Sequence, residues 1–350
     1  LLKSSILDRF CAPLCDAVFS SDEKDQSPDV GGGEFLDTVN RGGLFSIPLD
    51  VSGHWFRFHH QFRDLLRGRL DSECSSQEIA DLHRRASSWF ESRGLIDDAL
   101  TFALMLKDKS IAVRLVLENS GDLLLTEQNT RLESWLRKLP DTVIEAEPML
   151  IVLSGYMHHI RYRLPEWKTA LRRADARIDA MDPPAEDRAR LKSSVDAIRS
   201  SYCFFDSDLV GAINSAQSAI KHVPSEFLRL KIHAIAVLGL SLQCSGRQEE
   251  AFSILDKLSA KPEYQGPEAR AMLASTFCAI CMLDCRLPEM KRSAIRVQHA
   301  AKRSIAAVYK LYGRLYLAIP AYFCNEFDIV ERELGLDISD PYTQHDLVVV

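Results

Sequence analysis

The sequence predicts a mainly α-helical chain: a winged-helix domain, then a helical arm, then an α-superhelix (solenoid) of the tetratricopeptide-repeat (TPR) type. Three observations indicate this fold class. Two short strands run into an amphipathic helix between residues 44 and 70, no convincing strand pattern follows Ser76, and small residues recur about every 40 residues from Ala170 onward. We expect the winged-helix domain at residues 1–70, the arm at 71–145, the superhelix at 146–335 and a truncated continuation at 336–350.

The wing is predicted from a change in hydrophobic period. Two short apolar runs flank a turn at residues 50–53, namely Leu44, Phe45, Ile47 and Leu49, then Trp55, Phe56 and Phe58. From His60 onward the apolar residues fall at helical spacing, at Phe62, Leu65, Leu66 and Leu70. Upstream, a helical pattern covers residues 6–18, and Pro13 predicts a kink or a break within it.

The superhelix is predicted from a repeat of small residues. Ala170, Ala212, Ala251 and Ala294 are 42, 39 and 43 residues apart. The clearest repeat combines Gly239 with Ala251 and Leu255, because small residues let two helices approach closely. Between residues 77 and 140 we expect helices with breaks at Gly94, near Asp108 and at Gly121.

Several segments carry a family resemblance. LFSIPLD at 44–50 and HWFRFHHQFRDLLRGRL at 54–70 resemble a pattern of the large MalT-like, LuxR-type transcriptional regulators, which are signal-transduction (STAND) ATPases. SILDR at 5–9 with LCDAV at 14–18, LHRRA at 82–86 with Trp89, and WL at 135–136 with LP at 139–140 follow in the family's order. The resemblance is specific across residues 1–150 and weaker beyond.

The resemblance implies a regulatory fragment of such a regulator. An ATPase domain would precede Leu1, which is not an initiator methionine, and a helix-turn-helix domain would follow Val350. ATP or ADP would bind the parent protein, whereas this fragment would bind no cofactor. DNA would be contacted only through the missing C-terminal domain. Within the fragment, the winged helix would report the nucleotide state and the superhelix would bind an unknown inducer, a small molecule or a protein. The analogy also suggests self-association on activation.

His59 and His60 are candidate nucleotide sensors, because they lie where the second strand meets the helix. In nucleotide-switch ATPases of this class, a winged-helix histidine can contact the terminal phosphate of the bound nucleotide. An imidazole N–H can donate to an anion and does so more strongly when protonated. The alternative is that one ring packs in the core while the other is solvated.

Arg57, Arg63 and Arg67 belong to the most basic part of the chain, and we expect them to pair with carboxylates of the adjacent ATPase or arm domain. A DNA-binding surface is the rival interpretation. It is disfavoured because the helix at residues 33–42 that would enter the major groove carries Glu34 and Asp37 against only Arg41. Solvated arginines are the remaining alternative.

No catalytic residue and no metal site is predicted, and the fragment is not expected to be an enzyme. Cys278, Cys281 and Cys285 are spaced to share one helix face, but no histidine lies nearby, so we expect buried core thiols instead of zinc ligands. The Gly31-Gly32-Gly33 run lacks the Lys-Ser/Thr of a phosphate-binding loop.

The composition bounds the function classes. A net charge of −6 argues against the whole chain being a nucleic-acid binder. Nine cysteines without a disulfide-framework spacing fit a reducing compartment, and no apolar run reaches membrane-spanning length. We therefore expect a cytoplasmic protein that contacts no membrane. Two alternatives to a regulator stay open: a helical-repeat scaffold for protein–protein interactions, and an accessory repeat domain of a kinase-type enzyme.

Overall fold

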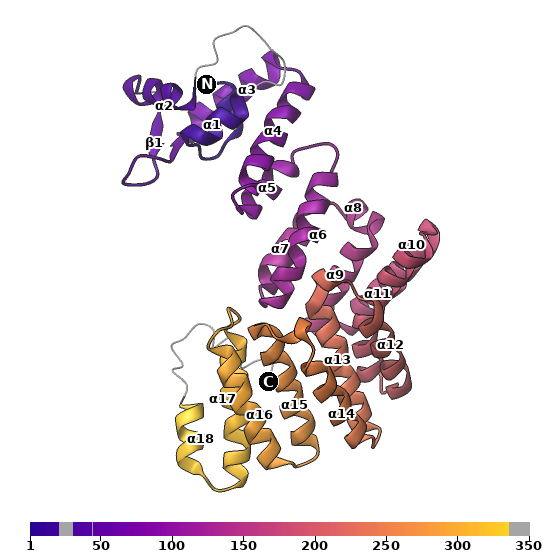
Figure 1. Cartoon of the computed structure of the whole chain (residues 1–350). Helices are drawn as coiled ribbons and strands as arrows, with labels where there is room; N and C mark the ends of the chain where they lie inside the picture. The colour runs from indigo at the N-terminus through magenta and orange to yellow at the C-terminus, as the bar shows by residue number, and fades with distance from the viewer. Residues whose placement is uncertain (21–30, 44, 336–350) are drawn as a thin grey trace. The chain divides into compact units, whose positions relative to one another are not determined.

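The computed structural model describes residues 1–20, 31–43 and 45–335, and the continuation expected at 336–350 lies outside them. The chain divides into two compact units, Leu1–Val116 and Leu117–Val350. Helices make up nearly all regular structure in the described part, and the only sheet there has two strands (Figure 1). The predicted fold class is therefore confirmed. The domain boundaries at residues 70 and 145 stay predictions.

The first unit is a set of short helices around a hairpin. Its elements, before the helix that leads into the second unit, are η1 (Lys3–Ile6), α1 (Ala12–Phe19), α2 (Gly32–Arg41), β1 (Ser46–Pro48), β2 (Phe56–Phe58), α3 (His60–Glu73), α4 (Ser76–Glu91) and α5 (Ile96–Ala103). In the antiparallel hairpin Ile47 lies opposite Arg57. Phe56 and Phe58 are buried while Arg57 between them is exposed, as the two-residue period of a strand requires.

The helical pattern predicted over residues 6–18 is broken, as Pro13 indicated. Chain residues 7–11 run between η1 and α1, and Cys11 caps α1 in an extended conformation with Pro13 in the first turn. Phe10 instead exchanges hydrogen bonds with Phe56, at 2.8 and 2.9 Å between N and O. This bridge extends the small sheet and packs Phe10 against Phe58, with ring centroids 4.6 Å apart.

The second unit is built from helix pairs. α6 (Ser110–Leu125) leads into it, followed by α7 (Asn129–Lys138), α8 (Asp141–Ala146), α9 (Pro148–Ile160), α10 (Leu164–Met181), α11 (Ala185–Phe205), α12 (Leu209–His222), η2 (Ser225–Phe227), α13 (Leu228–Cys244), α14 (Gln248–Ser259), η3 (Pro262–Tyr264), α15 (Pro267–Leu283), α16 (Leu287–Ala301), α17 (Val308–Phe323) and α18 (Phe327–Leu334). From α9 onward, successive helices pack in pairs (Figure 1).

The repeat residues lie where the pairs close. Ala170, Ala212, Ala251 and Ala294 occupy the second helix of successive pairs, and each is at most 2% exposed. In the pair α13–α14, a Cβ on Gly239 would lie 3.0 Å from Leu255 Cδ1, so the glycine permits the close approach. The helical superhelix inferred from the repeat is confirmed in this part of the chain.

Gly121 was wrongly predicted to break a helix. It lies inside α6, where a Cβ would come within 1.9 Å of the backbone oxygen of Glu226. The glycine therefore serves a close contact between α6 and η2, two segments far apart in sequence. A local reading of the sequence cannot detect such a contact.

One described stretch, Ser225–Cys244, is long and apolar enough to cross a membrane by length and composition, with a mean hydropathy of 1.4. It comprises η2 and α13, and 61% of its most apolar window is buried inside the structure. Burial of this kind is typical of a central helix in a helical-repeat domain.

Candidate functional site

The structure brings four of the five predicted site residues to one cavity in the first unit. The cavity has a volume of about 420 Å³ and is lined by Asp8, Ile47, Arg57, Phe58, His59, His60 and Arg63. Three segments supply this lining: the link between η1 and α1, the hairpin, and the first turn of α3. Sequence reasoning placed the histidines and arginines here but missed Asp8.

The histidines sit at the start of α3. His59 is the N-cap residue, its backbone N–H donates to the Phe45 carbonyl at 2.7 Å, and its side chain makes no capping hydrogen bond. His60 is the first helical residue and is exposed, whereas His59 is half-buried. The two rings lie 4.3 Å apart between centroids. A helix start without a side-chain cap presents backbone N–H groups and the positive end of the helix dipole to the cavity.

The charges around the cavity are unequal. Arg57 is exposed and has no hydrogen-bond or ion-pair partner among the described residues. Arg63 donates from Nη1 to the Asp8 carboxylate at 2.6 Å, and its buried Nε has no hydrogen-bond partner in the described chain, although the Asp64 carboxylate lies 3.8 Å away. Two guanidinium groups thus face one carboxylate. Together with the histidines and the helix start, this arrangement favours an anion.

Arg67 lies one turn further along α3 and has a different environment. Its Nε donates to the Ser5 carbonyl at 2.8 Å and its Nη2 to the Ile6 carbonyl at 3.0 Å, with Asp8 at 3.4 Å. Arg67 therefore binds the end of η1 within its own unit. The interdomain pairing predicted for Arg57, Arg63 and Arg67 stays a prediction, although Arg63 and Arg67 already have local partners.

The exposed face of α2 offers little to a nucleic acid. Glu34 and Asp37 are exposed, and Arg41 pairs with Asp37 at 3.6 Å. Phosphate binding needs unpaired cations, so this helix is poorly suited to enter a DNA groove.

A second polar cluster lies in the core of the second unit and was missed from the sequence. The His159 ring lies beside the His233 ring, with centroids 4.7 Å apart, and beside the Trp167 ring at 4.5 Å, and both pairs are tilted. Burial, and to a lesser degree the cation of Arg229, lower the pKa of His159 to about 3. The Tyr156 hydroxyl, His159 Nδ1 and Trp167 Nε1 are buried without a hydrogen-bond partner in the described structure.

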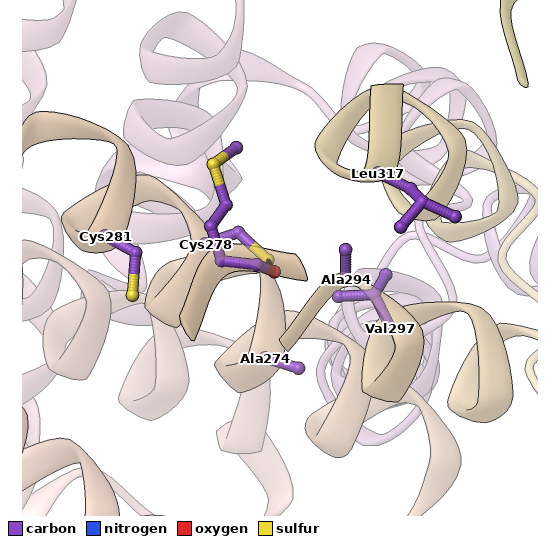
Figure 2. Close-up of a cluster of buried hydrophobic side chains, with 7 residues drawn as sticks. Ala274, Cys278, Cys281, Ala294, Val297 and Leu317 are labelled. Atoms are coloured by element: carbon purple, nitrogen blue, oxygen red, sulfur yellow. Dashed lines mark hydrogen bonds between the residues drawn. The ribbon is translucent and has the colours of Figure 1, made fainter. Parts of the chain in front are cut away.

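The cysteines divide into two environments. Cys278 and Cys281 are buried in a hydrophobic cluster with Met290, Ala294 and Leu317 (Figure 2), and burial raises the pKa of their thiols to about 12 and 11. Cys285 was expected on the same helix face, but α15 ends at Leu283 and Cys285 is exposed in a left-handed conformation at φ 54°. Within the ranges that the structure describes, no group of three or more His, Cys, Asp or Glu side chains could hold a metal ion.

A small wing between helices, followed by stacked helix pairs, defines a winged-helix module joined to a helical-repeat domain. Residues 1–78 match the family described as the MalT winged helix domain, so the N-terminal part of the chain is a domain of this type. The resemblance to MalT-like regulators is thereby confirmed.

Two kinds of relative extend the match beyond the wing. The chain is similar to the HTH-type transcriptional regulator MalT of Cronobacter sakazakii, with 29% identity over 222 residues, which are 63% of this chain and 24% of that protein. It is also similar to the serine/threonine-protein kinases PknK of Mycobacterium tuberculosis and Mycobacterium bovis, with 26% identity over 268 residues, covering 76% of this chain and 23% of each kinase. The chain thus spans about a quarter of these relatives. No solved structure matches.

Proposed function

We propose that the chain is the regulatory and signal-sensing part of a MalT-like, LuxR-family transcriptional regulator. The family match of the winged helix and the similarity to MalT support this proposal. In this account the fragment has no active site of its own. ATP or ADP binds an ATPase domain of the same protein, and DNA is contacted through a separate C-terminal domain. The protein acts in the cytoplasm.

The cavity beside His59 and His60 carries the nucleotide-switch part of the proposal. A phosphate entering it would meet the Arg57 guanidinium, the imidazole N–H of His60 and the unpaired backbone N–H groups of α3. Asp8 competes with the phosphate for Arg63, so the anion must gain more from Arg57 and His60 than it loses there. In the closed, ADP-bound state these contacts would hold the winged helix on the nucleotide.

Titration of this chain with pyrophosphate, followed by NMR of the histidine side chains, tests the cavity directly. We expect shifts of the His59 and His60 ring resonances and not of His54, which lies on the exposed hairpin turn and contacts Ser52 at 2.9 Å. Substitution Arg57→Gln should weaken the response, because one unpaired cation is removed. Equal shifts at all three histidines would indicate unspecific anion binding and contradict the proposal.

The superhelix supplies the sensing part. Stacked helix pairs form extended surfaces for ligands or protein partners, so an inducer is placed on the second unit. Binding there would shift the protein toward an active, self-associated state by favouring one of two conformations.

A kinase-linked role is the second candidate. The similarity to PknK covers more of this chain than the similarity to MalT does. A winged helix and superhelix in this setting would regulate a kinase domain of the same protein. Sequencing the gene on both sides of this segment decides between the two. An ATPase and a helix-turn-helix domain would support the regulator, and a kinase domain would support the alternative. The absence of all these domains would support a free-standing scaffold.

A further inference from the structure

A second cavity, of about 580 Å³, lies within the second unit and is separate from the histidine site. Its walls come from α6, α9, α11 and η2. Met149 and Phe227 are 7% and 5% exposed and contribute apolar surface, together with the half-buried Leu191. A concave site of this volume with a mainly apolar interior is of the size that holds a small organic ligand.

The charged groups of this cavity are mostly acidic. Glu118, Asp187 and Glu226 contribute three carboxylates, and all three residues are exposed. Arg190 is the one cation of the lining, and its Nη2 already donates to the Glu186 carboxylate at 2.6 Å. The lining residues therefore carry more negative than positive charge, which favours a cation over an anion.

We propose that this cavity binds an amphipathic cation, with an apolar body against Met149, Leu191 and Phe227 and an amine among the carboxylates. The proposal rests on the sensing role given to the second unit and names the chemical class of its ligand. An apolar body gains free energy by leaving water, and the charged head stays at the exposed rim, where it need not be fully desolvated.

The cavity is built so that a ligand would touch elements far apart in sequence. The backbone of Glu226 sits directly on Gly121 of α6, which fixes η2 against that helix. Since η2 leads directly into α13, a ligand held between α6, α11 and η2 would couple α6 to the central helix of the superhelix.

Binding of three probes with the same alkyl chain, n-octylamine, 1-octanol and octanoate, tests the proposal by calorimetry on this chain. We expect octylamine to bind at least about fivefold more tightly than octanol, and octanoate to bind most weakly. Leu191→Trp should weaken binding of all three, because the larger side chain would occupy part of the apolar wall on which the alkyl chain packs. Octanol or octanoate binding as tightly as octylamine would overturn the assignment of a cationic ligand.

Charge-neutralising variants keep the test valid if Leu191→Trp fails to fold. Asp187→Asn changes an exposed side chain, and we expect it to weaken octylamine about three- to fivefold while leaving octanol unchanged. Asp256→Asn, an exposed position on α14 outside the cavity lining, is the matched control and should change neither. Equal loss in both variants would mean unspecific attraction to an acidic protein. Failure here leaves the pyrophosphate response of the first unit untouched, so the two proposals can fail separately.

Discussion

The Tyr309 hydroxyl donates a hydrogen bond of 3.2 Å to the carboxylate of Glu127, 182 residues away along the chain. The same oxygen of Glu127 accepts from Nε of Arg229 at 3.1 Å. Glu127 follows α6, Arg229 lies on α13 and Tyr309 on α17, so three distant parts of the second unit meet at one carboxylate. The side chains of Arg229 and Glu127 are only 14% and 20% exposed, which makes this a largely buried ion pair.

Glu127→Gln should destabilise the second unit strongly. It leaves the Arg229 guanidinium largely buried without its counter-charge, and breaking a buried pair in this way costs about 3–5 kcal/mol. Tyr309→Phe removes only one hydrogen bond and should cost about 1 kcal/mol. Urea unfolding followed by circular dichroism compares the two. Equal, small losses would mean that the pair contributes little to stability.

Ala251→Phe should overpack the pair α13–α14 and cost about 1–3 kcal/mol, because the Ala251 side chain is fully buried. Ser253→Phe on the same helix is the control, since Ser253 is exposed and should tolerate the larger side chain within about 0.5 kcal/mol. Melting temperatures of the two variants give the answer. An unchanged melting temperature for Ala251→Phe would contradict the packing described here.

Gly121→Ala should destabilise the second unit, because the new methyl group would lie 1.9 Å from the Glu226 backbone oxygen and η2 must move. Gly68→Ala is the matched change in the first unit. Gly68 lies inside α3, is exposed, and a Cβ there would meet nothing within 4 Å, so alanine should stabilise by up to about 1 kcal/mol. The melting temperatures of the two variants should therefore shift in opposite directions from that of the unaltered chain, and shifts of the same sign would contradict the contact described for Gly121.

The second unit should lose stability as the pH falls below about 6.5. His159 has a folded-state pKa of about 3, and burial first, then His159 and Arg229, hold the pKa of His233 well below its usual value. Between the folded and unfolded pKa values, these histidines bind protons in the unfolded chain but not in the folded one. Their contribution to stability is therefore full above the unfolded pKa, and below it the free energy of unfolding falls by up to about 1.4 kcal/mol per pH unit for each residue.

Urea midpoints at pH 7.5 and 5.0 measure this dependence. His159→Gln should reduce the loss of stability between the two pH values, because one of the acid-sensitive groups is removed. His222→Gln, at an exposed histidine near the end of α12, should leave the loss as it is in the parent chain. An unaltered pH dependence in His159→Gln would show that this histidine is not buried in its neutral form.

Local patterns predicted the fold well where the signal was local. The change of period at His60 placed the hairpin and α3, and Pro13 indicated the break before α1. The alanine repeat identified the second helix of four pairs. Gly121 was misread because the contact that requires glycine comes from Glu226, about a hundred residues later, and nothing near Gly121 reveals it.

The candidate sites show the same division. His59, His60, Arg57 and Arg63 are neighbours in sequence, so their convergence on one cavity could be inferred from the strand–helix junction. Asp8 was missed as their partner because its pairing with Arg63 spans 55 residues, although it lies in a segment that resembles the family pattern. The Glu127–Arg229–Tyr309 cluster has separations of 102 and 182 residues and no sequence signature at all.

Whether the histidines of the winged helix hold the bound nucleotide is measured by the rate of ADP release from the full-length parent protein. Loss of one charge-assisted hydrogen bond to a phosphate costs about 1.5–3 kcal/mol, so His60→Ala should release ADP about tenfold faster or more and activate partially without inducer. His54→Ala, on the exposed hairpin turn, should release ADP at the parent rate. Unchanged release in His60→Ala would contradict the account, and faster release in His59→Ala alone would assign the phosphate contact to the other histidine.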